Sequence, residues 1–471
     1  MNPLFIPIYQ LYLLQLENYE LGRYWTLLFQ KGYFFSKTPL RKTIVWTQKT
    51  VSIFGLAFLF YVGCAWVSYF LLGTIPACIS LALGFCLFPI FYTVASICLL
   101  PIDFLVKQFF ITKAKRMLSS SDVKIIGIAG SYGKTTMKSV LLSVLSTKLQ
   151  VIATPESVNT PIGIAQWLVR TLKKETDVAV IEYGEHYKGD IAGLCEVFPP
   201  DIAVLTGINE AHLERLKTLG TSIATMFEIV EHAKPHAHII LNADDEHIKS
   251  SYKIYEKDKQ VFFYSSINDP LSQMRVSKRV FDEEKLRWTC VIEGVGTVTI
   301  PLLGEYAIGD CLAALMVGKI LGLTNEDMKK GLIGIKPVPH RLEPIQGKGD
   351  VLVIDDSYNG NPDGVSEAIR VLARFKKRRK VFITPGLVEI GSKTASIHER
   401  IGRELAGVAD RVILIKNSVT SFIEKGLNSE KFDETHIIWF NTAEEAHASL
   451  SSVVQAHDVV LFQNDWGDQY I

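Results

Sequence analysis

The sequence predicts an α/β protein in which two parallel-sheet domains follow a two-helix transmembrane hairpin. Three observations lead to this prediction. Residues 50–102 contain no Asp, Glu, Lys or Arg. Short apolar strands alternate with helices from Val123 to about residue 320, and a second such series begins at Val351. Strands this apolar, separated by helices, are typical of parallel sheets that are covered on both faces.

The uncharged stretch is long enough for two membrane spans. It divides at GTIP (residues 73–76) into two apolar runs, each about as long as the roughly 20 residues that cross a hydrocarbon core. A buried helical hairpin in a soluble protein is one alternative. A cleaved signal peptide fits less well, because the run begins late and is too long. We therefore expect a transmembrane hairpin over residues 44–116.

Basic residues flank the hairpin on both sides, whereas the connecting turn carries no charge. They are Lys31, Lys37, Arg41, Lys42 and Lys49 before it, and Lys107, Lys113, Lys115 and Arg116 after it. Because basic flanks stay in the cytoplasm, both termini and the large C-terminal part should be cytoplasmic, with the turn crossing the cytoplasmic membrane.

Residues 1–43 precede the hairpin and are rich in aromatic side chains. They predict an amphipathic helix that lies on the cytoplasmic interface or packs against a partner, with a plain soluble helix as the alternative. The whole chain has 50 basic and 49 acidic residues, so no global field favours nucleic acid as a partner. No CxxC pair is present, and we expect neither disulfides nor a zinc site.

The central domain is expected over residues 117–335. VKIIGIAG (residues 123–130) predicts a strand that runs into a glycine turn, and KTTMKSVLLSVLSTKL predicts the helix that follows. This P-loop-type arrangement presents backbone N–H groups to phosphate, with Lys134 reaching the β- and γ-phosphates and Thr135 binding Mg²⁺. Further strand-and-turn units are expected at residues 177–184, 201–208 and 237–245.

Residues 260–303 alternate in hydropathy and carry turn residues, which predicts a small antiparallel insertion, and a helix is expected at about residues 307–321. The segment 334–350 is rich in proline and glycine and marks a domain boundary. Beyond it, five apolar strands with intervening helices predict a C-terminal Rossmann-like domain over residues 336–471.

The phosphate loop does not meet the strict consensus GxxxxGK[ST]. It has the form GxxGxxGKTT, with glycines at positions 127, 130 and 133. This form resembles the Mur ligases, which join amino acids or peptides to peptidoglycan precursors by ATP-driven amide formation. Further segments resemble motifs of that family in the same order along the chain. They are VNTPIG (158–163), VIEYGEHYKGDI (180–191), INEAHLERL (208–216), PHRLE (339–343) and DDSYNGNPDG (355–364).

The resemblance covers about residues 123–471 and implies a function. DSYNGNP is similar to the subtype that adds D-alanyl-D-alanine to a muramoyl-tripeptide. In such a ligase ATP phosphorylates a carboxylate, an amine attacks the acyl phosphate, and phosphate leaves. The transfer needs cations that spread the charge of the γ-phosphate. The implied cofactors are ATP and Mg²⁺, and the implied partners are a muramyl-peptide precursor and D-alanyl-D-alanine or a similar amine.

Roles are carried over by position in the matching motifs. Glu182 ends an apolar strand and is expected to bind Mg²⁺ with Thr135 and His212; a solvated strand end and a structural histidine are the alternatives. Arg341 is expected to contact the transferring phosphate, and Asp356 the ribose. The catalytic candidates are Lys134, Glu182, His212 and Arg341. The nucleotide-binding candidates are Gly130, Gly133, Lys134, Thr135, Thr136, Asp310, Arg341 and Asp356. The substrate candidates are Asn159 near the acyl phosphate and Tyr358, Asn359 and Asn361 near the amine.

Three segments depart from the family pattern. Met226 stands where many of these ligases have a carbamylated lysine that bridges two metal ions, and a thioether cannot replace a carbamate on Mg²⁺. In the adenine segment, Tyr306, Ala307 and Asp310 replace a histidine and two asparagines, and an ionised Asp cannot donate a hydrogen bond as Asn does. The C-terminus, DVVLFQNDWGDQYI, is acidic where the subtype has a basic turn.

The hairpin also occupies the place of the N-terminal domain that holds the UDP end of the substrate in the soluble ligases. A donor that is lipid-linked rather than UDP-linked would suit an enzyme at the inner leaflet. A membrane scaffold that binds nucleotide but has lost ligation is the alternative function. A P-loop kinase or transport ATPase fits less well, because two spans cannot form a pore alone.

Overall fold

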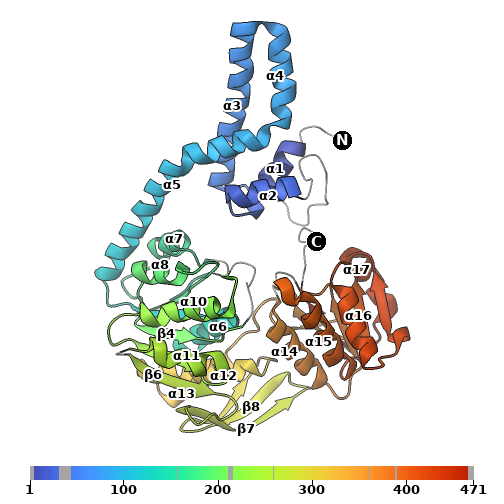
Figure 1. Cartoon of the computed structure of the whole chain (residues 1–471). Coiled ribbons are helices and arrows are strands. Elements are labelled where there is room, and N and C mark those ends of the chain that lie inside the picture. The colour runs from blue at the N-terminus through green and yellow to red at the C-terminus, as the bar shows by residue number, and fades with distance from the viewer. Residues whose placement is uncertain are drawn as a thin grey trace. The chain divides into compact units, whose positions relative to one another are not determined.

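The computed structural model describes residues 5–30, 44–155, 158–209, 216–257, 259–358, 360–387 and 390–464 (Figure 1). The chain forms two compact units, Met1–Phe109 and Phe110–Ile471. The first unit is helical, and the second contains two separate sheets with helices on their faces.

The N-terminal unit consists of α1 (Phe5–Leu16), α2 (Leu21–Gln30), α3 (Gln48–Leu72), α4 (Thr74–Cys86) and the first two thirds of α5 (Phe88–Ser119). Thr47 caps α3 by accepting a hydrogen bond from the backbone N–H of Thr50. Gly73 alone separates α3 from α4, and its φ of 91° is a conformation that favours glycine. By length and composition, α3 and α5 could each cross a membrane.

The second apolar run was expected as one helix, and the structure corrects this. Leu87 leaves the helical conformation, and α4 ends there while α5 begins one residue later. Pro89 lies in the first turn of α5, where its missing N–H costs nothing. The second apolar run therefore forms two helices in place of one straight helix. Helix α4 contacts α3 through the hydrogen bond from Ser80 Oγ to Ser68 Oγ (3.0 Å), and α5 follows α4 in the chain.

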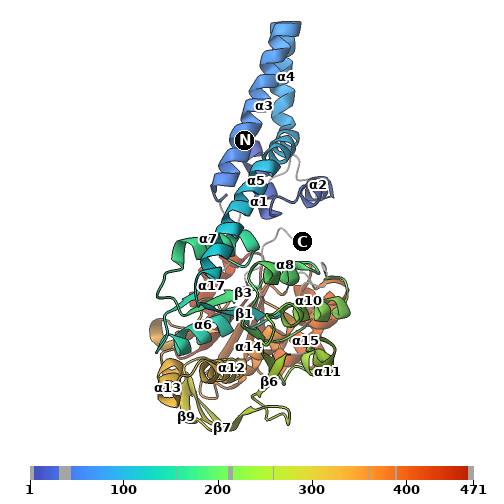
Figure 2. The same cartoon turned by 90° about the vertical axis from the view of Figure 1, so that its left-hand side faces the viewer.

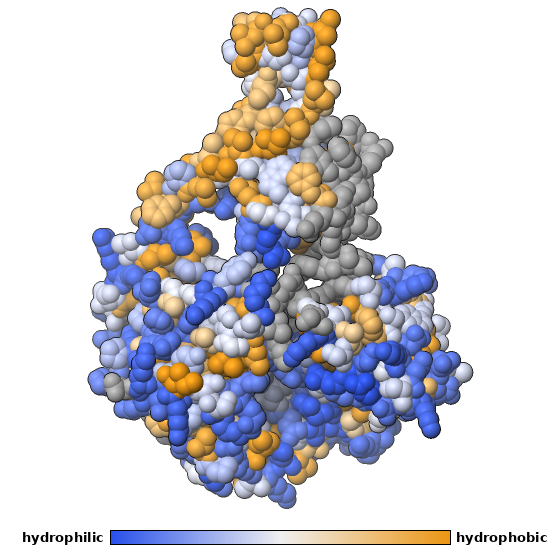
Figure 3. Space-filling model, in the orientation of Figure 1, coloured by the Kyte–Doolittle hydropathy of each residue, from blue (hydrophilic) through white to orange (hydrophobic). Residues whose placement is uncertain are grey.

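The aromatic N-terminal segment packs on this hairpin. Leu11 and Leu14 of α1 and Tyr24 and Leu28 of α2 are buried in one cluster with side chains of α3 and α5. Trp25 Nε1 donates to Thr93 Oγ1 of α5 at 3.1 Å. The expected amphipathic character holds for α2, whereas α1 is apolar around most of its surface. The outer surface of α3, α4 and α5 is also largely apolar, as the orange side chains in Figure 3 show.

The first sheet of the second unit has nine strands in the order β2-β3-β1-β4-β5-β6-β7-β8-β9. They are β1 (Lys124–Ala129), β2 (Val151–Ala153), β3 (Val178–Glu182), β4 (Ile202–Leu205), β5 (His238–Asn242), β6 (Gln260–Ser265), β7 (Met274–Asp282), β8 (Arg287–Ile292) and β9 (Gly296–Ile300). The pairs from β2 to β7 are parallel, and β7, β8 and β9 are antiparallel. The predicted antiparallel insertion is therefore shorter than expected, because β6 extends the parallel sheet.

Helices cover both faces of this sheet (Figure 2). One buried cluster joins the strands to α6 (Lys134–Leu145), α12 (Tyr306–Ile320) and α13 (Asn325–Ile333). The other joins them to α7 (Pro161–Thr171), α8 (Asp190–Val197), α10 (Leu219–Glu231) and α11 (Glu246–Tyr255). Ile111 and Ala114, near the end of α5, are buried in this second cluster, so the last turns of α5 belong to the core of the sheet domain.

The second sheet has six strands in the order β10-β11-β15-β12-β13-β14. They are β10 (Glu343–Gln346), β11 (Leu352–Asp356), β12 (Lys380–Thr384), β13 (Arg411–Ile415), β14 (Ile437–Phe440) and β15 (Val459–Gln463). Five of them are the predicted parallel strands, and β10 adds an unexpected antiparallel edge. The helices are α14 (Pro362–Ala373), α15 (Thr394–Ala406), α16 (Thr420–Ser429) and α17 (Ala443–Val453), with short 3-10 turns η1 (Lys348–Asp350), η2 (Gly391–Lys393) and η3 (Glu434–His436).

Candidate active site

The phosphate loop connects β1 to α6 and depends on its glycines. Gly130 has a φ of 146° and Gly133 a φ of 78°. A Cβ on Gly130 would lie 2.2 Å from Oγ1 of Thr206, so another residue there would displace the loop. Thr206 donates to the carbonyls of Ala129 and Tyr132, which holds the loop against the end of β4. The first turn of α6 therefore faces the cavity with its backbone N–H groups free of helical partners.

Two carboxylates lie opposite two lysines at this helix. Glu182, the last residue of β3, accepts from Lys138 Nζ at 2.9 Å, and Thr135 Oγ1 is 3.4 Å from the same carboxylate oxygen. Lys134 Nζ donates to the carbonyl of Gly130 and to Glu185 Oε2 at 3.3 Å. Both carboxylates are largely buried, with side chains 12% and 1% exposed. Each carboxylate is thus paired with an ammonium group.

One cavity of about 860 Å³ joins these residues to the second sheet. Its wall contains Ser131–Thr136, Asn159, Glu182, Glu185, Asp310, Arg341, Asp356, Tyr358 and Asn361. Most of the wall follows the carboxyl ends of parallel strands, which is where such sheets present their ligand sites: the segments after β1, β3 and β11, with Thr206 after β4 and Asn242 at the end of β5. Asp310 comes from α12, and Arg341 from the turn before β10. The structure therefore brings together the predicted phosphate-loop, carboxylate and C-terminal residues that it describes.

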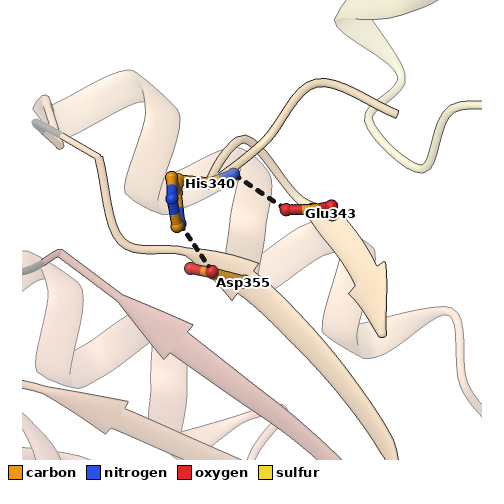
Figure 4. Close-up of side chains that lie close together, drawn as sticks. All are labelled: His340, Glu343 and Asp355. Carbon is orange, nitrogen blue, oxygen red and sulfur yellow. Dashed lines mark hydrogen bonds and ion pairs between the residues drawn. The ribbon is translucent and has the colours of Figure 1, made fainter. Parts of the chain in front are cut away.

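A strained turn positions Arg341 at the cavity. His340 and Leu342, on either side of it, have φ values of 59° and 48°, which are uncommon for residues other than glycine. His340 Nδ1 lies 2.7 Å from Asp355 Oδ2, and the His340 backbone N–H donates to Glu343 Oε2 at 3.1 Å. Figure 4 shows these two interactions as dashed lines. The Arg341 guanidinium then lies over the Tyr358 ring, 4.8 Å from its centroid.

His340, Glu343 and Asp355 form the group that, within the described part of the chain, offers three ligand atoms close enough for a metal ion. The hydrogen bonds of His340 to Glu343 and Asp355 account for the positions of these three side chains. We therefore interpret the group as one that stabilises the turn at Arg341. Asp356 lies at the end of β11 and accepts from the backbone N–H of Leu342 at 3.2 Å. Burial raises the pKa of Asp356 to about 7, against the lowering effect of the Arg341 guanidinium.

Asn159 and Asn361 line the cavity and also lie against the backbone around it. A Cβ on Gly184 would lie 2.5 Å from Asn159 Nδ2, so the turn after Glu182 requires glycine beside Asn159. Asn361 caps α14 by accepting from the Gly364 N–H at 3.1 Å. It also accepts from Asn209 Nδ2 at 3.0 Å, a hydrogen bond between the two sheet domains. Asn361 is therefore partly committed to structure, although it lines the cavity.

Several expected residues lie outside the described part of the chain or outside the cavity. His212, Asn359 and the acidic C-terminal residues 465–471 are not described. Met226 belongs to α10, is 1% exposed and packs into the core of the first sheet, apart from the residues that line the cavity. Gly133, Thr135, Thr136 and Asp310 lie on the cavity wall, whereas Gly130 precedes the first lining residue, Ser131, and shapes the loop from behind it.

Sequence reasoning missed four residues that contact the predicted site. Lys138 pairs with Glu182, and Glu185 pairs with Lys134. Thr206 donates to the phosphate loop at Tyr132, and Asn209, after β4, donates to Asn361 at the start of α14. Lys138 could have been found from its position one helical turn after Lys134, on the same face of α6. The other three depend on contacts between segments distant in the sequence.

Comparisons with known proteins agree with this architecture. The model of the Mur ligase middle domain matches residues 128–318, and that of the Mur ligase, glutamate ligase domain matches residues 340–463. The UDP-N-acetylmuramoyl-tripeptide–D-alanyl-D-alanine ligase of Bacillus subtilis is 26% identical over 356 residues, covering 75% of this chain and 76% of that protein. The ligase of the same name from Buchnera aphidicola is 30% identical over 309 residues, covering 65% and 67%. The crystal structure of the MurF ligase from Thermotoga maritima in complex with ADP has a TM-score of 0.67 at 26% identity, covering 76% of this chain and 80% of that one.

Proposed function

The chain belongs to the Mur ligase family, and we propose that it is an ATP-dependent ligase that extends a muramyl-peptide precursor at the cytoplasmic membrane. The observation that carries this proposal is the single cavity that joins the phosphate loop, Glu182 and Arg341. The relatives that match it are named as ligases that add D-alanyl-D-alanine to UDP-N-acetylmuramoyl-tripeptide. We propose the same reaction for this chain, with a carboxylate activated as an acyl phosphate and attacked by the amine.

The residues present fit Mg²⁺, which prefers oxygen ligands and near-octahedral geometry. Glu182 offers a carboxylate and Thr135 a hydroxyl 3.4 Å from it, both at the start of α6. We propose that they hold Mg²⁺ together with His212. When bound, the ion offsets charge on the phosphates. Lys138, now 2.9 Å from Glu182, would then be displaced toward the phosphates.

The remaining roles follow from where the side chains lie. Lys134 begins α6 and is proposed to neutralise the γ-phosphate. Gly130 and Gly133 allow the phosphate loop its conformation, and Gly133 and Thr136 line the cavity beside Lys134. Arg341, held over Tyr358 by the strained turn, is proposed to stabilise the charge that moves with the phosphoryl group. Asp356 at the neighbouring strand end is proposed to accept from the ribose hydroxyls.

The amine is proposed to dock on the C-terminal domain. Tyr358 is 50% exposed and lines the cavity. Asn361 accepts its hydrogen bonds from Asn209 and Gly364 through its amide oxygen, and its amide N–H₂ is proposed to donate to the amine substrate. Asn359, next to them, is included by its position in the motif. Asn159 lies across the cavity beside Gly184 and is proposed to contact the acyl phosphate.

The membrane location is the second part of the proposal. Helices α3 and α5 have the length and composition of membrane spans, and the basic flanks favour a cytoplasmic ligase domain. The hairpin lies outside both matched family regions. We propose a lipid-linked muramyl peptide as the donor, because confinement to one surface raises its effective concentration. We propose domain boundaries after residues 43, 116 and 335. Helix α5 (Phe88–Ser119) runs across the boundary at residue 116.

The test uses the full chain in nanodiscs with D-alanyl-D-alanine and either a UDP-linked or a lipid-linked muramyl tripeptide. The readouts are ADP and phosphate release and the mass of the amide product. Lys134→Ala and Glu182→Ala should each lower turnover by roughly 100-fold or more, since both act on transition-state charge. Lys174→Ala, an exposed lysine of the same domain, is the matched control. Absence of any amide product from both donors would reject the ligase proposal, and a preference for the UDP-linked donor would reject the membrane part.

A further inference from the structure

Asn209 joins the two sheet domains beside the cavity. It follows β4 of the first sheet and is only 3% exposed. Its amide Nδ2 donates to Asn361 Oδ1 at 3.0 Å and to Asp363 Oδ2 at 2.7 Å. Both acceptors belong to the start of α14 in the C-terminal domain, and both line the cavity. One buried amide of the first domain therefore holds two polar side chains of the second.

The direction of these hydrogen bonds is fixed by groups that have only one role. The backbone N–H of Gly364 can only donate, and it donates to Asn361 Oδ1 at 3.1 Å. A carboxylate, such as that of Asp363, only accepts. Asn209 must therefore turn its N–H₂ group, and not its oxygen, toward α14. The two hydrogens of that group match the two acceptors.

The segment that carries Asn209 is also attached to the phosphate loop. The backbone N–H of Ser131 in that loop donates to the carbonyl of Gly207 at 2.8 Å. Thr206 Oγ1 donates to the carbonyl of Tyr132. Asn209 therefore extends from a stretch of backbone that is held against the loop at which the phosphates are proposed to bind.

The other end of this link lies at the place proposed for the amine. Asn361 and Tyr358 are proposed to dock the amine on the C-terminal domain, whereas Asn159, across the cavity, is proposed to contact the acyl phosphate. Amide formation requires the two reactants to meet at bonding distance, and a displacement of about 1 Å can lower the rate by about 100-fold. The position of α14 relative to the phosphate loop therefore sets how closely the amine approaches the acyl phosphate.

We propose that Asn209 is a positioning residue for the amine step. It fixes the start of α14 so that the docked amine faces the acyl carbon. In that step the amine nitrogen bonds to the acyl carbon, the C–O bond to phosphate breaks, phosphate keeps the electron pair, and the nitrogen gives one proton to water. In this role Asn209 itself exchanges no proton. The inference rests on the proposed function, because the acyl phosphate and the amine are its reactants.

The test compares two acceptors for the same acyl phosphate. The full chain in nanodiscs receives ATP, Mg²⁺ and the muramyl tripeptide that supports the faster turnover, with either D-alanyl-D-alanine or hydroxylamine. Hydroxylamine is small and needs no docking site, and it converts the acyl phosphate to a hydroxamate with release of phosphate. In Asn209→Ala, amide formation should fall by about tenfold or more relative to hydroxamate formation. The affinity for ATP, measured by titration calorimetry, should not change. Asn428→Ala, which alters an exposed asparagine of α16, is the matched control.

Charge variants test the contact itself. Asn209→Asp places two carboxylates against each other, so the ratio of amide to hydroxamate should fall below that of Asn209→Ala. Adding Asp363→Asn supplies a donor to the new carboxylate, so the double variant should recover at least the ratio of Asn209→Ala. Asp363→Ala removes the same contact from the C-terminal domain. It should lower the ratio in the same direction, and it replaces Asn209→Ala if that variant does not fold.

Four results would overturn the proposal while leaving the proposed function intact. Three concern the products: an unchanged ratio of amide to hydroxamate in Asn209→Ala, an equal loss of both products, and a double variant no better than Asn209→Asp. The fourth is weaker ATP binding by Asn209→Ala, because the residue would then support the phosphate loop itself. Formation of neither product by the unmodified chain would reject the proposed ligase function together with this inference.

Discussion

Lys134 Nζ lies 3.3 Å from Oε2 of Glu185, although the two residues are 51 positions apart in the sequence. The Glu185 side chain is 1% exposed and the Lys134 side chain 14% exposed, so water screens the pair weakly. The same ammonium group is proposed to contact the γ-phosphate. Phosphate must therefore compete with a buried carboxylate for the lysine.

We predict that Glu185→Gln increases the affinity for ATP in the absence of divalent metal. Gln keeps the size of the side chain but removes a negative charge that faces the phosphate site, so the gain should be about tenfold, or about 1.4 kcal/mol. Titration calorimetry in EDTA measures it. Asp190→Asn changes a carboxylate at the start of α8 that accepts hydrogen bonds from two backbone N–H groups there, and should leave ATP affinity unchanged. Unchanged or weaker binding by Glu185→Gln would show that the carboxylate does not oppose phosphate.

The strained turn at Arg341 gives a second prediction. His340 has a φ of 59° and its ring is hydrogen-bonded to Asp355 (Figure 4). His340→Ala loses this hydrogen bond and keeps the strain, whereas His340→Gly loses the bond but relieves the strain. We expect the Gly variant to be more stable than the Ala variant by about 1 kcal/mol in chemical denaturation. Both should lower turnover relative to the unmodified chain, since Arg341 would lose its fixed position over Tyr358.

The stability measurement tests the strain of the turn, and the pH profile of turnover separates a positioning role from a catalytic histidine. Equal stabilities of the two variants would mean that the turn relaxes without glycine. Loss of turnover with an unchanged pH profile in both variants fits a positioning role for the His340 ring. A shifted pH profile would instead indicate that the ring exchanges a proton during the reaction.

The end of α5 predicts where the ligase part can be separated from the hairpin. Ile111 and Ala114 are buried with the strands of the first sheet, so a chain that begins at Phe110 retains its core. A chain that begins at Val123 lacks them and should be less stable by about 2–4 kcal/mol, because a buried face of the sheet domain becomes exposed. Thermal unfolding with and without ATP measures the difference. Equal unfolding temperatures for the two chains would show that the last turns of α5 do not support the sheet.

The charged residues that bound the hairpin predict its topology. Lys49 and Asp103 are the first charged residues on either side of the uncharged stretch, and Lys49 Nζ lies 2.7 Å from Asp103 Oδ2. The ion pair brings the two ends of the hairpin together, and we therefore predict that both lie at one membrane surface. In a cysteine-free background, Thr74→Cys should react with an impermeant maleimide added outside intact cells, and Lys49→Cys and Asp103→Cys only after lysis. Reaction of Asp103→Cys from outside would contradict the two-span arrangement.

The sequence predicted features that depend on one segment of the chain better than features that depend on contacts between segments. The glycine loop, the apolar strands and the uncharged stretch are local patterns, and the helices and strands that they predicted are present. The bend at Leu87 was missed, because a continuous apolar run contains no signal for where a helix stops against its neighbours. The extension of the parallel sheet by β6 was missed for the same reason, since pairing partners are not encoded in one segment.

The sequence by itself determined the phosphate loop, the residue types of the site and the apolar length of the hairpin, because each depends on a few adjacent residues. Only the tertiary structure decided the partners, the burial and the charge of those residues. It paired Lys134 with Glu185, joined Asn209 to Asn361 by a hydrogen bond, and buried Asp310 Oδ2 without a hydrogen-bond partner among the residues that the structure describes. A side chain's charge depends on the solvent and the charges around it. For Asp310 these come from α6, β6 and the phosphate loop, which meet only when the chain folds.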